Sequence, residues 1–337
     1  MRTDRHCRRQ FLGSCLAVAG VGLLAGCGGI PPWQTVSRIP LVGYVAPGTV
    51  TGYGSRADAF REGMRALGYE EGANLALEVR WAEKEADVPG LAAEVVGLQP
   101  RIIVAGGSAA IRPIWNATQT IPIIFVADNA DPVEAGYAES YARPGKNLTG
   151  LTGLSPHVTQ KRLALLKEVV PSMTRVAVLR NPESPDRERL SSETEAGAAA
   201  LGLQLQWLEV TDATQIDPAI GAASRDRADA LIVLRDPLTN NNRPRIVTLA
   251  AEKRLPAMYA SREAVDIGGL MTYGPNIYHL YHRTATYVDR ILKGAKPGEL
   301  PIEQPTTFEL VVNLRTAQAL GLTIPSSILS QATEVIQ

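Results

Sequence analysis

Short apolar runs alternate with amphipathic segments along most of the chain, in a regular order. Runs typical of strands are Ile39–Val45, Leu75–Trp81, Arg101–Ala105 and Ile121–Val126. Helical patterns separate them at Asp58–Leu67, Val88–Leu98 and Ala109–Ala117. Strands that alternate with helices in this way form a parallel sheet with helices on both faces. The first part of the chain therefore predicts one α/β lobe.

The same order then starts again. Strand patterns occur at Arg175–Leu179, Leu203–Val210, Ala230–Leu234 and Pro256–Tyr259. The helical patterns are Thr159–Val169, Ser191–Leu201, Ala213–Ser224 and Pro244–Lys253. Two successive blocks of this kind predict an α/β fold of two doubly wound, Rossmann-like lobes with parallel sheets.

The boundary between the lobes is expected near the turn-rich stretch 143–146, so that residues 39–150 form lobe 1 and residues 151–275 lobe 2. After these come a long helical pattern at 277–292, a linker at 293–298, a strand pattern at 308–312 and a helical pattern at 315–320. We expect this tail to cross between the lobes, with about 276–303 returning to lobe 1 and about 304–337 to lobe 2.

Composition narrows the classes of function. Of the 337 residues, 45% are hydrophobic and 20% charged, which excludes a disordered chain and a membrane protein with many spans. Lys and Arg together number 34, as do Asp and Glu, and no basic stripe is present, so nucleic acid is not an expected partner.

The N-terminus is typical of an export signal with a lipidation site. Arg8 and Arg9 precede an apolar run from Phe11 to Gly26, which is shorter than the ~20 residues that span a membrane. The run ends in Leu-Ala-Gly-Cys27, which resembles the bacterial lipobox, where the cysteine is acylated after cleavage. The arginine pair fits twin-arginine export or the ordinary basic start of a Sec signal. We predict a signal over 1–27, a linker over 28–38 and a lipid anchor on Cys27.

Cleavage at this site also determines the cysteine content and the net charge of the folded part. All three cysteines, Cys7, Cys15 and Cys27, lie within the signal, so the folded part lacks disulfides and depends on a large core. Removing four arginines and Asp4 from 34 basic and 34 acidic residues leaves 30 and 33, a formal charge of −3. This charge suits an exported soluble domain on a tether.

Candidate chemistry gathers where strands give way to helices, since open parallel sheets bind ligands at the carboxyl ends of their strands. The strand pattern at 102–105 leads into Gly106 and Gly107, then Ser108 at an expected helix N-cap, followed by Ala109. Free N–H groups there form an anion cradle, and Ser108 equally fits the role of capping its own helix. The loop lacks the spacing of a dinucleotide fingerprint, a P-loop or a nucleophile elbow.

Other loops on that edge carry polar side chains, namely Asp128, Asp131, Asn181 and Asp236. An aspartate before proline is also a common turn or helix-start device, so each fits a structural role as well as ligand contact. His279 and His282 are spaced to share a helix face but lack a third metal ligand, and His157 is isolated. We therefore expect no metal, no cofactor and no catalytic residue.

Several motifs in order resemble one protein family. They are the segments 58–69, 104–108, 131–133, 142–150, 161–163, 236–238, 268–274 and 304–310. Together they are similar to ABC transporter substrate-binding proteins whose better-known members take up tryptophan or tyrosine, within the type I periplasmic binding proteins. The similarity extends from about Ile39 to Val335. It implies two lobes joined by three crossovers, a ligand cleft between them, and partner permease and ATPase subunits.

Two segments depart from the family pattern. The loop at Asp128–Ala130 is longer and more acidic, and Thr239–Asn242 replaces a segment where relatives often carry aromatics. Both make the expected pocket more polar, which disfavours an aromatic amino acid. We expect Ser108 and Ala109 to bind an anionic end and Asp236 or Asp128 a cationic end.

The walls of the pocket are expected to close through Pro47, Thr49 and Tyr273. The sequence thus predicts a non-enzymatic, lipid-anchored, periplasmic or otherwise extracytoplasmic binding protein for an amino-acid-like or other polar solute. A receptor that feeds a membrane sensor has the same fold. A two-lobe α/β enzyme would need a placed nucleophile or base, for which the chain offers little.

Overall fold

The computed structural model describes residues 39–128, 131–153 and 157–337. The predicted signal, the linker at 28–38 and the lipidation site at Cys27 lie outside these ranges. No helix in the described ranges combines the length and the apolar character needed to cross a membrane.

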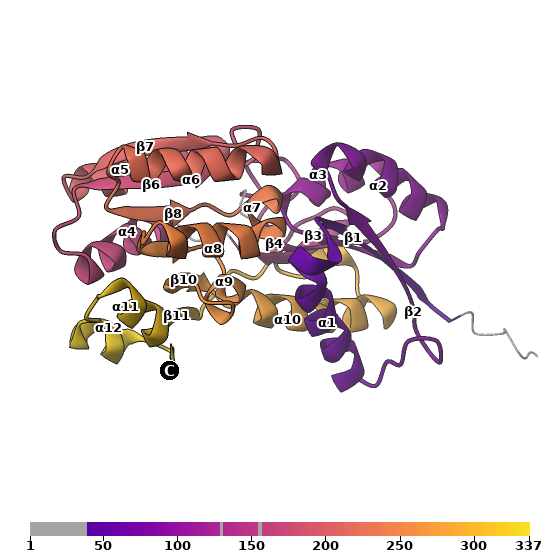
Figure 1. Ribbon diagram of the computed structural model, residues 1–337. Coiled ribbons are helices and arrows are strands. Elements are labelled where there is room, and N and C mark those ends of the chain that lie inside the picture. The colour runs from indigo at the N-terminus through magenta and orange to yellow at the C-terminus, as the bar shows by residue number, and fades with distance from the viewer. Residues whose placement is uncertain (1–38, 129–130, 154–156) are drawn as a thin grey trace, which may run out of the picture. The chain divides into compact units, whose positions relative to one another are not determined.

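The first sheet contains five parallel strands in the order β2-β1-β3-β4-β5. Their bounds are β1 Leu41–Pro47, β2 Ala76–Ala82, β3 Ile102–Gly106, β4 Ile123–Asp128 and β5 Leu148–Thr152. Alternate residues of β1 enter different cores because strand side chains point to opposite faces. Tyr44 packs with α1 (Val50–Ala66) and α10 (Ile277–Leu292), and Val45 packs with α2 (Val88–Gly97) and α3 (Ser108–Ala117). We call this sheet and its four helices the first lobe (Figure 1).

The second sheet has the order β12-β11-β10-β9-β8-β6-β7. Its strands are β6 Arg175–Arg180, β7 Gln204–Glu209, β8 Ala230–Val233, β9 Ala257–Tyr259, β10 Met271–Pro275, β11 Phe308–Asn313 and β12 Glu334–Ile336. The helices α4 (Val158–Val169), α5 (Arg187–Ala200), α11 (Leu314–Leu320) and α12 (Ser326–Gln331) share one core. A second core includes α6 (Ile216–Arg225), α8 (Arg243–Glu252) and α9 (Arg262–Asp266). This sheet, its helices and α7 (Pro237–Asn241) form the second lobe.

The chain passes between the lobes after β5, after β10 and again before β11. The helix α10 follows a strand of the second sheet but packs beside α1 in the first lobe (Figure 1). Gly63 allows this close approach, because a Cβ atom there would lie 2.3 Å from the carbonyl oxygen of His282.

The predicted α/β fold class is confirmed, and several elements differ in detail. The strand β11 runs antiparallel to β10, so the second sheet is not wholly parallel. The helix α1 begins at Val50, eight residues before the predicted start, with the Thr49 hydroxyl accepting from the N–H of Gly52. Glycines at 52 and 54 hide this start, since glycine weakens a helical pattern. The elements β5, α7, α9, α12 and β12 are short, and the sequence patterns do not predict them.

Candidate functional site

A cavity lies between the two lobes, at the carboxyl ends of β1, β3, β4 and β8. The cavity is narrow, with a volume of about 30 Å³. The first lobe contributes Pro47, Tyr53, Arg56, Glu85, Gly107, Ser108, Ala109, Ala127 and Tyr281. The second lobe contributes Ser184, Pro185, Asp186, Arg235, Asp236 and Pro237.

Of the residues that the sequence indicates, five line this cavity: Pro47, Gly107, Ser108, Ala109 and Asp236. Asn181 lies one contact away, because its Nδ2 donates to both carboxylate oxygens of Asp236 at 3.3 Å. Asp128 is the last residue of β4, and its backbone lies opposite Thr152 of β5 in the sheet, beyond a bulge at Ala127. Ala127 itself lines the cavity with a φ of 57°, an uncommon conformation for alanine that turns the chain there.

The other three indicated residues do not line it. Thr49 caps α1 and lies beside the second lobe, where its backbone N–H donates to Asn241 Oδ1 at 3.0 Å. Asp131 accepts from the N–H of Val133 at 2.8 Å and so stabilises its own turn. The ring of Tyr273 stacks on Phe308 with 5.9 Å between centroids.

The start of α3 differs from the expected capping arrangement. Gly107 occupies the N-cap position with a φ of 101°, and Ser108 is the first helical residue. The Gly107 N–H already donates to the carbonyl of Val126 at 2.9 Å. The Ser108 hydroxyl donates to Asp186 Oδ2 of the other lobe at 3.2 Å. A protein carboxylate therefore already lies beside the predicted anion cradle, and this contact joins the lobes.

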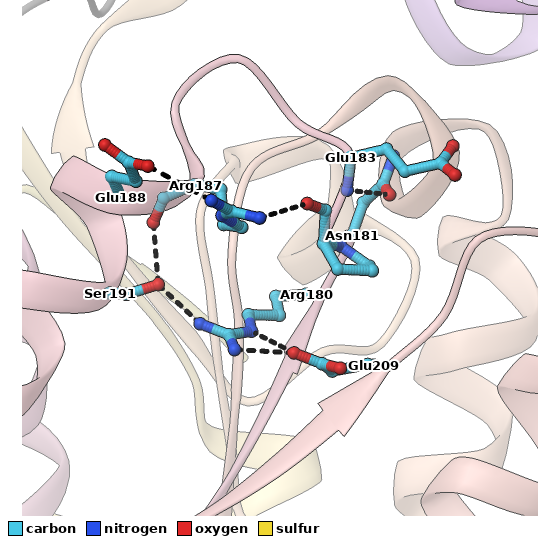
Figure 2. A network of polar contacts seen from close by, with 8 residues as sticks. Arg180, Asn181, Glu183, Arg187, Glu188, Ser191 and Glu209 are labelled. Atoms are coloured by element: carbon cyan, nitrogen blue, oxygen red, sulfur yellow. Dashed lines mark hydrogen bonds and ion pairs between the residues drawn. The ribbon is translucent and has the colours of Figure 1, made fainter.

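Asp186 belongs to the loop that follows β6, which a network of polar contacts holds in place (Figure 2). Asn181 Oδ1 accepts from the N–H of Glu183 at 2.9 Å. Arg180 pairs with Glu209 of β7 at 2.6 Å, and Ser191 of α5 accepts from the same guanidinium. Both ends of the loop are thereby fixed to the second lobe, which orients Asp186 toward the cavity.

Asp236 has a structural role as well as a place in the cavity. It is 4% exposed and caps α7, with Oδ1 accepting from the N–H of Leu238 at 2.8 Å. Burial raises the pKa of Asp236, and the bonds from Leu238 and Asn181 partly oppose this effect. The carboxylate is therefore partnered by the protein and still faces the cavity.

Glu85 is a third carboxylate at this site, in the short 3₁₀ turn Glu85–Asp87 after β2. Its buried Oε1 atom has no hydrogen-bond partner among the described residues. Burial, followed by the negative charges of Asp236, Asp186 and Glu183, raises the pKa of Glu85 to about 7. A cationic group in the cavity would relieve this repulsion.

Two arginines face the same cavity. The Arg56 side chain is 3% exposed, and its Nε donates to Glu263 Oε1 of the second lobe at 3.3 Å. Arg243 approaches the same carboxylate at 3.9 Å. Burial raises the pKa of Glu263, but the charges of Arg56 and then Arg243 outweigh it and lower the value to about 2. Arg235, two residues after the end of β8, has no hydrogen bond or ion pair with any described residue.

Further hydrogen bonds join the lobes beside the cavity. Asn240 Nδ2 donates to the Tyr53 hydroxyl at 3.1 Å, and the Thr49 hydroxyl donates to Asn241 Oδ1 at 3.2 Å. Together with the Arg56–Glu263 pair, they hold α1 against the segments that carry Asn240 and Glu263. The lobes are thus in direct contact around the site, which is a closed arrangement.

Sequence patterns do not single out Arg56, Glu85, Asp186 or Arg235, which carry most of the charge in the cavity. Arg56 precedes the predicted start of its helix, and Glu85 follows an edge strand. Arg235 adjoins the indicated Asp236, and Asp186 lies in the same loop as Asn181. Both of these last two therefore lie within five residues of a position that the sequence indicates.

No group of three or more His, Cys, Asp or Glu side chains in the described ranges is placed to hold a metal ion. What the cavity offers is charge of both signs, several hydrogen-bond groups and walls from two lobes. Such an arrangement is chemically suited to binding and orienting a small polar molecule.

Known proteins share this architecture. The sequence profile described as ABC transporter substrate binding protein matches residues 52–336. A tyrosine-binding protein of Clostridioides difficile is 24% identical over 266 residues, which are 78% of this chain and 75% of that protein.

Two solved structures are similar over nearly the whole described chain. A conserved domain protein of Vibrio cholerae has a TM-score of 0.81 and 28% identity, covering 88% of this chain and all of the other. A domain from Streptococcus pneumoniae in complex with L-Trp has a TM-score of 0.80 and 23% identity, covering 88% and 99%.

Proposed function

Because the chain belongs to the family of ABC transporter substrate-binding proteins, we propose that it captures a small amino-acid-like solute between its lobes and delivers it to a permease. The observation that carries this proposal is the charge of the cavity. Arginine and carboxylate side chains from both lobes face one narrow space. A zwitterion has a partner there for each of its charges.

The known relatives support the same class of solute. One relative is named for tyrosine binding, and one similar structure holds L-Trp. Tyr53 and Tyr281 line part of the cavity together with prolines and alanines, and the other side chains of the lining are polar or charged. This mixture supports an amino acid and leaves the polarity of its side chain to measurement.

Delivery requires that the protein remain near a membrane. We infer that Cys27 carries the lipid, that the exported chain lies outside the cytoplasm, and that a permease and an ATPase are its partners. The lipobox-like end of the apolar run supports the anchor, and the family supports the partners. Several acyl chains on one cysteine would hold the protein stably, since one chain binds membranes only reversibly.

Calorimetric titration with the proteinogenic L-amino acids tests the binding function. We expect at least one to bind, and we expect Asp236→Asn to weaken it by roughly 30-fold, about 2 kcal/mol, through loss of a buried charge pair. Asp212→Asn is the matched control, because Asp212 caps the 3₁₀ turn Ala213–Gln215 in the same way but is exposed. If no amino acid binds, the proposed solute class is wrong.

A further inference from the structure

The charge in the cavity also indicates how a solute would be oriented, which rests on the function proposed above. We propose that the solute carries a carboxylate and that this group binds between the guanidinium groups of Arg56 and Arg235. Neither arginine was indicated by the sequence, and the residues that were indicated for an anion lie on α3.

Arg56 presents a fixed and incompletely satisfied donor group. Its Nε is held by Glu263 at 3.3 Å, and its guanidinium carbon lies 4.4 Å from the centre of the Tyr53 ring. These contacts fix the plane of the group. The Nη2 atom is buried, and none of the residues in the described ranges accepts a hydrogen bond from it. A buried donor without an acceptor is costly, so the fixed Nη2 marks a place where an anion would be stabilised.

Arg235 adds a second cation without a protein counter-ion in contact. It lines the same cavity from the end of β8, and no described residue pairs with it. Burial, then repulsion by Arg56, lowers the pKa of Arg235, whereas Asp186 opposes that effect through attraction at a distance. Two guanidinium groups that repel each other across one cavity favour an anion between them. A carboxylate matches the planar geometry of their N–H groups.

The start of α3 is a poorer place for the same carboxylate. Asp186 already accepts from the Ser108 hydroxyl there, at 3.2 Å, and the Gly107 N–H is bonded within the first lobe. A second carboxylate at this position would meet the charge of Asp186. The cationic nitrogen of the solute is better placed between Asp236 and Glu85, which line the same cavity, and Glu85 Oε1 has no partner within the described part of the chain.

A comparison of acids with their amides tests the orientation. Each L-amino acid that binds the full-length protein is compared with its C-terminal carboxamide, which keeps the ammonium but removes the anionic charge. We expect the carboxamide to bind at least 30-fold more weakly. The Arg235→Gln variant should bind the acid at least 30-fold more weakly than the wild-type protein does. In this variant the affinities for acid and amide should differ by less than about 3-fold.

Arg245→Gln serves as the control variant, because Arg245 is exposed and paired with Asp217 on the second lobe. It should leave both affinities unchanged. Because Arg235 has no paired partner in the described fold, Arg235→Gln should unfold at the temperature of the wild-type protein or above it. Equal binding of acid and amide by the wild-type protein would overturn the orientation and leave the proposed function intact. An equal loss of both ligands in Arg235→Gln would overturn it too.

Discussion

Replacing Glu263 by glutamine tests whether the buried ion pair between the lobes stabilises the fold. Glu263 lies in α9, and its carboxylate lies against Arg56 of α1 with side chains only 10% and 3% exposed. The variant keeps the size of the side chain but leaves the buried Arg56 without its counter-charge. Removing one partner of a buried pair is costly because the other charge stays buried.

The size of the expected stability loss follows from the pKa of Glu263. The pKa of Glu263 is about 2 in the folded protein, against an ordinary value of 4.5. At about 1.4 kcal/mol per pKa unit, this difference corresponds to roughly 3 kcal/mol of folding stability. Because the folded-state pKa is lowered, this stability is fully present above pH 4.5 and is lost as the pH falls toward 2. At pH 3 the same relation leaves about half of this stability.

Urea unfolding at pH 7 and pH 3 measures both values. We expect Glu263→Gln to lower the free energy of unfolding by roughly 3 kcal/mol at pH 7 and by about half of that at pH 3. Glu299→Gln is the control, since Glu299 is exposed and lies beside Lys296. A loss below about 1 kcal/mol at pH 7, or one that is the same at both pH values, would refute the linkage argument.

Two further predictions concern packing and pH. Gly63→Ala should destabilise the fold by several kcal/mol, because the new Cβ would meet the His282 carbonyl oxygen at 2.3 Å. Gly90→Ala in α2 should instead stabilise the fold by about 0.5–1 kcal/mol, because open space surrounds this position. Thermal unfolding of both variants checks this, and similar losses would contradict it. Binding of an amino acid should strengthen from pH 6 to pH 8, because the pKa of Glu85 is raised to about 7 and only its charged form attracts an ammonium. Titrations of Glu85→Gln should lack this dependence, and an unchanged pH profile would count against a role for Glu85.

The sequence predicts the sheets well because strands buried on both faces are short apolar runs, as in β3 and β8. It predicts short or glycine-containing elements poorly. The helix α7 has only five residues, and α1 begins with glycines that weaken its pattern. Such elements form because tertiary contacts stabilise them. An example is the hydrogen bond that Asn241 of α7 accepts from the backbone N–H of Thr49 at the start of α1. Information of that kind is distributed over distant residues.

The same reasoning explains which site residues could be predicted. Ser108 and Asp236 directly follow strands or begin helices, so their place at the edge of a sheet is local information. The contribution of Arg56 depends on a contact with Glu263, 207 positions away along the chain. A charged residue in an amphipathic helix is ordinarily assigned to a solvated face, and only the folded structure shows that Arg56 is buried between the lobes.

The position of Arg56 also connects solute capture with closure of the lobes. A ligand favours a closed form only by binding that form better than the open one. Arg56 belongs to the first lobe and Arg235 to the second, so both face one cavity only when the lobes are together. The pair with Glu263 forms in that same arrangement and fixes the guanidinium that faces the cavity. An anion held between the two arginines would therefore stabilise closure directly, and weakening the Glu263 pair should reduce affinity as well as stability.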